Sequence, residues 1–122
     1  MINYVIGGRG SGKTTKLIKM SAETGYPIVV TDSIRREDLL SLAKTLNFKI
    51  PLPITYIEWM NQSYLFPYRM REDRIKDVYI DNVDDLLTQI FNGVSIHTVT
   101  LTGPIEVERL ERDDSCGFQN NN

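Results

Sequence analysis

Residues 7–14 read Gly-Gly-Arg-Gly-Ser-Gly-Lys-Thr, and no other part of the chain constrains the fold as strongly. The octapeptide matches the spacing G-x-x-x-x-G-K-[ST] at every fixed position. A short apolar, β-prone run at residues 3–6 precedes it, and a helical pattern begins at Lys13. The sequence therefore predicts a strand that turns through glycines directly into a helix, as in α/β proteins with parallel strands.

This order of residues favours a phosphate-binding loop, the P-loop, over a plain glycine turn that caps a helix. Glycines let the backbone wrap closely around phosphates, and the amide N–H groups at the helix start then point inward. Lys13 would reach the β- and γ-phosphates, and the Thr14 hydroxyl would ligate Mg²⁺. We expect ATP or another nucleoside triphosphate to contact Gly7, Gly8, Arg9, Gly10, Ser11, Gly12, Lys13, Thr14 and Thr15.

Two of these positions are open to another interpretation. Arg9 is a variable position of the loop, so its side chain could contact phosphate, although solvent exposure is favoured. Thr15 could contact the α-phosphate or pack on the helix surface, and the sequence favours neither.

A second motif lies at residues 78–81, Val-Tyr-Ile-Asp, an apolar strand that ends in an acid. A carboxylate at the tip of a parallel strand can hold the Mg²⁺ shell, usually through water. An aspartate there could instead only cap the next helix, but the loop upstream favours the metal role. Asp81 is therefore the second predicted metal-binding residue, with Thr14.

The rest of the chain predicts one small α/β domain over residues 1–104 and a polar C-terminal extension over 105–122. About five β-prone runs, at 3–6, 27–31, 51–54, 78–81 and 97–102, alternate with helical patterns. The prolines at 51 and 53 place the third strand at an edge or a strand start. We expect a three-layer P-loop fold: a mainly parallel sheet of about five strands with helices on both faces.

Composition limits the cellular location and the partners expected for this domain. The chain has 122 residues, a net charge of −2 and one cysteine, and no run approaches the length of a membrane span. A cytoplasmic protein is expected, with no membrane partner. The net charge does not support nucleic-acid binding, although four basic residues gather within 68–76 and could form a local patch or an arginine finger.

With both motifs in place, the sequence resembles the P-loop NTPase superfamily. The loop and the Val-Tyr-Ile-Asp strand are similar to the ATPase domains of phage terminase large subunits and of small phage ATPases. The loop followed by Thr15 and Lys16 is also similar to thymidine kinases, but the cysteines of their zinc site are missing. The resemblance implies a minimal ATPase core, in the host cytoplasm if it is phage-encoded.

The same resemblance points to two further catalytic candidates. Many ATPases of the additional-strand class place glutamate directly after the acidic strand end, as the base that polarises water. Here that position is Asn82, whose amide can orient a water but cannot accept its proton, which leaves Asp84 or Asp85 as a substitute. Thr102, at the end of the expected fifth strand, would sense the γ-phosphate or only form a turn.

Three functions fit these residues. The first is a Mg²⁺-dependent ATPase in which Lys13, Asp81, Asn82 and Thr102 act, coupled to a protein partner or to self-assembly. The second is a small-molecule kinase of the nucleoside type, for which only residues 68–76 offer a lid. The third is a nucleotide-gated binding module with little turnover, which Asn82 favours.

Overall fold

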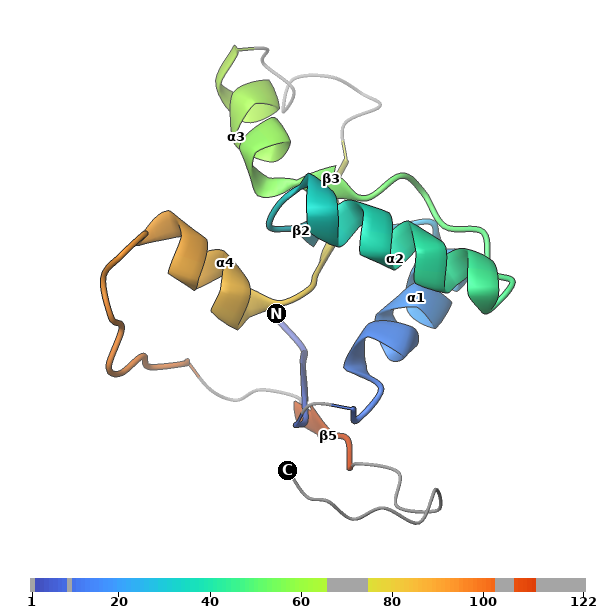
Figure 1. Cartoon of the computed structure of the whole chain (residues 1–122), viewed down its shortest axis with the longest axis horizontal. Coiled ribbons are helices and arrows are strands. Elements are labelled where there is room, and N and C mark those ends of the chain that lie inside the picture. The colour runs from blue at the N-terminus through green and yellow to red at the C-terminus, as the bar shows by residue number, and fades with distance from the viewer. Residues whose placement is uncertain (1, 9, 66–74, 103–106, 112–122) are drawn as a thin grey trace.

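The computed structural model describes residues 2–8, 10–65, 75–102 and 107–111. Within these ranges, parallel strands alternate with helices, as predicted (Figure 1). The strands are β1 (Tyr4–Ile6), β2 (Ile28–Val30), β3 (Ile54–Thr55), β4 (Tyr79–Ile80) and β5 (Val107–Arg109). The helices are α1 (Lys13–Thr24), α2 (Ser33–Thr45), α3 (Tyr56–Leu65) and α4 (Val83–Ile90).

The strands form two small parallel sheets instead of the one predicted sheet. One sheet has the order β3-β2-β4, and the other pairs β1 with β5. β3 lies at an edge, as its neighbouring prolines predicted. The α/β class and the parallel strands are thus confirmed, whereas the single sheet is not.

The hydrophobic core lies around β2, whose three residues are all buried. Ile18 of α1 and Leu39 and Ala43 of α2 pack against Ile28 and Val30. An uninterrupted apolar strand is typical of a strand covered on both faces, which explains why the sequence identified β2 correctly. Figure 1 shows α1 and α2 packed together on one flank, with α4 on the other flank of β4.

Local signals in the sequence set the ends of the helices. Gly25 ends α1 in the left-handed conformation, with φ 80°. Asp32 caps α2 by accepting a hydrogen bond from the backbone N–H of Arg35 at 2.9 Å. Thr55 and Glu58 form a capping box at the start of α3: the Thr55 N–H donates to Glu58 at 3.1 Å, and the Glu58 N–H donates to Thr55 at 3.2 Å.

The prediction of a fifth strand at 97–102 was wrong. Residues 97–102 form no strand and are exposed, and β1 pairs instead with Val107–Arg109, within the segment predicted as a polar extension. An ion pair of 2.7 Å joins Lys16 of α1 to Glu108 of β5. The charged residues that make β5 a weak strand in sequence terms therefore contribute to its contact with α1.

None of the residues of α4 is fully buried. Leu86 and Leu87 are half-buried, whereas Ile90 and Phe91 are 46% and 50% exposed. Among the residues that the structure describes, no helix has the length and apolar character needed to cross a membrane.

Candidate functional site

The glycine loop leaves β1 at Ile6 and enters α1 at Lys13, as the sequence predicted. Gly10 and Gly12 have φ of 76° and 90°, a region that residues with a side chain rarely adopt. The Ser11 N–H donates to the Gly8 carbonyl at 3.2 Å and closes a turn between them. The glycines at 10 and 12 are thus required by the backbone conformation itself.

Gly7 is required for a different reason, because its surroundings leave no room for a side chain. A Cβ atom at position 7 would collide with Ser11 Oγ and lie 2.7 Å from the Leu110 carbonyl oxygen. That carbonyl follows β5, whose pairing is extended by a hydrogen bond of 2.7 Å from the Leu110 N–H to the Ile6 carbonyl. The start of the loop is therefore packed directly against the β1–β5 sheet.

Two polar groups of the loop fit an anionic ligand. The Lys13 ammonium folds back over the loop and donates to the carbonyls of Gly7 and Gly8. Ser11 Oγ is buried and has no hydrogen-bond partner among the residues that the structure describes. A buried hydroxyl without a partner is costly, and a phosphate oxygen would satisfy it. The inward-facing helix start, the ammonium and this hydroxyl together suit a phosphate chain.

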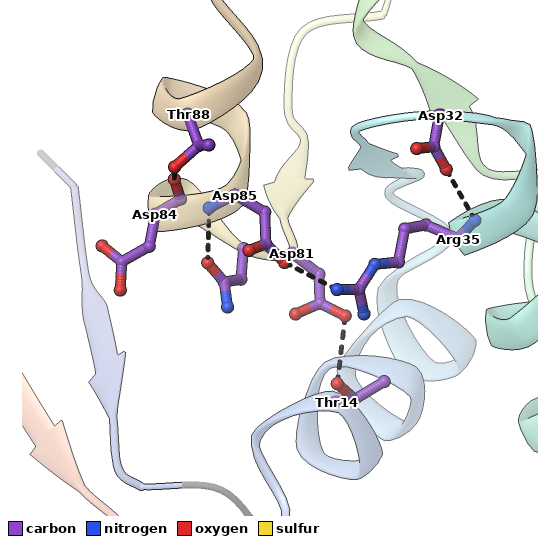
Figure 2. Close-up of polar contacts among 8 residues, drawn as sticks. Thr14, Asp32, Arg35, Asp81, Asp84, Asp85 and Thr88 are labelled. Carbon is purple, nitrogen blue, oxygen red and sulfur yellow. Dashed lines mark hydrogen bonds and ion pairs between the residues drawn. The ribbon is translucent and has the colours of Figure 1, made fainter. Parts of the chain in front are cut away.

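The two sequence motifs meet at one hydrogen bond, which Figure 2 shows at the start of α1. Thr14 Oγ1 donates to Asp81 Oδ2 at 3.1 Å, joining residues that lie 67 positions apart in the sequence. Asp81 lies at the carboxyl end of β4, where ligands bind in open α/β sheets. Burial raises the pKa of Asp81, and the bond from Thr14 and the charges of Arg35 and Lys13 oppose that rise. Thr14 Oγ1 and Asp81 Oδ2 are both hard oxygen ligands of the kind that Mg²⁺ takes.

Arg35 is a site residue that the sequence did not assign. Its side chain extends from the first turn of α2 toward Asp81 and Asp85 (Figure 2), and Nη2 lies 3.0 Å from Asp85 Oδ2. The signal was present, because a cation in the first turn of a helix opposes the helix dipole and needs another explanation.

Asn82 has a structural role that the sequence did not predict. Its Oδ1 caps α4 by accepting a hydrogen bond from the Asp85 N–H at 3.1 Å. Asp84 is exposed. Its carbonyl accepts a hydrogen bond from Thr88 Oγ1 at 2.9 Å. Of the two carboxylates considered as a substitute base, Asp85 is the one that faces the loop, because it lines the same cavity.

A cavity of about 360 Å³ lies over the loop and falls in the size range of small-ligand sites. It is lined by Gly8, Gly10, Ser11, Gly12, Lys13, Thr14, Thr15, Val30, Arg35, Asp38, Leu39, Leu42, Asp81, Asn82 and Asp85. Most of the predicted nucleotide-binding residues, together with Asp81 and Asn82, thus converge on one opening.

The other predicted features either do not line this cavity or fall outside the described residues. Thr102 is exposed and does not line the cavity. Arg9 and most of the basic stretch at 68–76 lie outside the described residues. Comparisons of the chain with protein-family models, with curated proteins and with solved structures found no match.

Proposed function

We propose that this chain binds a nucleoside triphosphate with Mg²⁺ at residues 7–14 and hydrolyses it, with ATP as the preferred nucleotide. The observation that carries the proposal is the hydrogen bond between Thr14 and Asp81. It brings together a glycine loop of the phosphate-binding pattern and a carboxylate at a strand end, two parts that lie in distant segments of the sequence.

Each residue has a distinct part in this function. The amides of the loop and the Lys13 ammonium bind the β- and γ-phosphates, and Ser11 Oγ donates to a phosphate oxygen. Thr14 and Asp81 would hold Mg²⁺, which supplies charge neutralisation of the phosphates when bound. For this role Asp81 must be ionised, and the positive charges of Arg35 and Lys13 favour that form.

The described residues of the site are poorly suited to accept a proton from the attacking water. Asn82 lines the cavity, but its Oδ1 is engaged as the cap of α4, and an amide accepts no proton. Asp85 is a carboxylate that lines the cavity, but its Oδ2 is already engaged by Arg35 at 3.0 Å. We therefore expect slow turnover by the isolated chain, raised by a protein partner or by self-assembly.

The engagement of Asn82 also favours a second candidate, a module that binds the nucleotide and changes partner affinity with little turnover. The two candidates share the binding step and differ only in the fate of the γ-phosphate. Binding and phosphate release must therefore be measured on the same samples.

The test compares the wild-type chain with Lys13→Ala and with Lys19→Ala as a matched control. Lys19 lies on the same helix and is exposed, so its loss removes the same charge outside the loop. Binding of a fluorescent ATP analogue with Mg²⁺ should be lost in Lys13→Ala and kept in Lys19→Ala. Phosphate release from ATP should follow the same order, with and without single- and double-stranded DNA.

Each other outcome has a defined meaning. Equal binding by all three proteins would refute the P-loop assignment. Binding without phosphate release would support the module over the ATPase, and transfer of phosphate to an added nucleoside would indicate a kinase.

A further inference from the structure

Two adjacent arginines lie in the first turn of α2, and they have different roles. Arg36 donates to Glu58 at 2.7 Å and to the Pro53 carbonyl at 3.3 Å, and its side chain is only 19% exposed. It ties α2 to the start of α3 and is structural. Arg35 points the other way, into the cavity over the glycine loop (Figure 2).

The pairing of Arg35 with Asp85 does little for the fold. The two side chains are 56% and 42% exposed, and ion pairs at such positions contribute little to stability. The position of Arg35 also works against the dipole of its own helix. The fold therefore does not explain why a guanidinium is held here, and its bond to Asp85 can be exchanged for another at small cost.

The charges of the cavity supply an explanation. Among the described residues, three carboxylates line it, those of Asp38, Asp81 and Asp85, together with two cations, Lys13 and Arg35. Lys13 belongs to the loop, so Arg35 is the cation on the opposite wall, beside the acidic strand end. Without Arg35, a further phosphate entering past Thr14 would approach a wall of carboxylates.

We propose that Arg35 is the residue that distinguishes a nucleoside triphosphate from a diphosphate. In the nucleotide-free chain its guanidinium is held by Asp85, and it exchanges this carboxylate for the γ-phosphate when a triphosphate occupies the loop. The planar fork of a guanidinium matches two phosphate oxygens as well as it matches a carboxylate. This inference rests on the proposed nucleotide-binding function and adds a specificity residue to it.

The experiment measures affinities for the β,γ-imido analogue of ATP and for ADP, both with Mg²⁺, by isothermal titration. Arg35→Gln should weaken binding of the triphosphate analogue by about tenfold or more, the range expected for loss of a charge-assisted hydrogen bond. ADP binding should change by less than about threefold, since the lost bond is made to the γ-phosphate.

Three more variants sharpen the result. Arg35→Lys keeps the charge but loses the fork, so it should discriminate between the two nucleotides less well than the wild type and better than Arg35→Gln. Asp85→Asn removes the competing carboxylate and should strengthen triphosphate binding. Arg36→Gln should lower thermal stability while leaving the ratio of the two affinities unchanged.

The possible outcomes distinguish the role of Arg35 from nucleotide binding itself. If the wild type binds neither nucleotide, both proposals fall. If it binds both, and Arg35→Gln weakens both equally or neither, the role of Arg35 is refuted while nucleotide binding stands. Should Arg35→Gln fail to fold, the discrimination ratio of Arg35→Lys decides in its place.

Discussion

Gly7 offers a sharp test of how the loop is joined to the sheet beside it. An alanine at position 7 would bring its Cβ into collision with Ser11 Oγ and within 2.7 Å of the Leu110 carbonyl oxygen. Gly8 is the matched control, because a Cβ there has no atom within 4 Å. Neither glycine is among those with positive φ, so the backbone conformation excludes alanine at neither position.

The expected difference follows from these contacts. Overpacking a tight site costs about 1–3 kcal/mol. The gain from restricting the unfolded chain, about 0.4–1 kcal/mol, is shared by both variants and cancels in their comparison. For a chain of this size each kcal/mol moves the Tm by roughly 4 °C, so Gly7→Ala should melt about 4–12 °C below Gly8→Ala.

Thermal melts followed by far-UV circular dichroism, without nucleotide, measure this difference directly. Ser11 Oγ lies at the end of a short side chain, but the Leu110 carbonyl is backbone and can move only with the end of β5. Equal Tm values for the two variants would show that the loop is not packed against the β1–β5 sheet as described.

Three further predictions concern stability. Asp81→Asn should raise the Tm at neutral pH and weaken Mg²⁺-dependent nucleotide binding. The Tm should rise because burial raises the pKa of Asp81 above its ordinary 3.8, so the ionised carboxylate costs stability at pH values above the raised pKa. That gain should shrink as the pH falls through the raised value, and a gain that is constant with pH would contradict the argument. Glu58→Gln should lower the Tm, because the Thr55 N–H and Arg36 lower the pKa of Glu58 below its ordinary 4.5. The loss should be full above pH 4.5 and should fade as the pH drops through the lowered pKa, which melts across an acid series would reveal. Asn82→Ala removes the cap of α4 and should cost about 1 kcal/mol, whereas Asn82→Asp keeps an acceptor and should cost less, as chemical denaturation can measure.

The sequence was sufficient wherever a local rule determines the structure. The glycines of the loop, Gly25 at the end of α1 and the Thr55–Glu58 box each act within a few residues, and the loop glycines were identified by their spacing. β2 was identified because a buried parallel strand is continuously apolar. By contrast, residues 97–102 have the composition of a strand but form none, while β5 has the sequence Val-Glu-Arg. Which segment pairs with β1 is a non-local outcome, and composition carries little information about it.

The candidate site divides in the same way. Lys13, Thr14 and Asp81 were predicted from their spacing or strand-end position, and the structure brings all three to one cavity. Arg35 was not assigned, since its contact is with Asp85, 50 positions away in the sequence. The cap formed by Asn82 was missed because the residue was judged only against a catalytic role.

The hydrogen bond from Thr14 to Asp81 also has a mechanical consequence. Thr14 lies in α1, which follows β1, and Asp81 comes directly after β4 of the other sheet. Their contact therefore joins the two sheets at the carboxyl ends of these strands. A ligand held by both residues would link the two sheets, and its binding energy would stabilise both of them. Amide hydrogens of β1 and β2 should then both exchange more slowly when the ligand is bound than in the free protein.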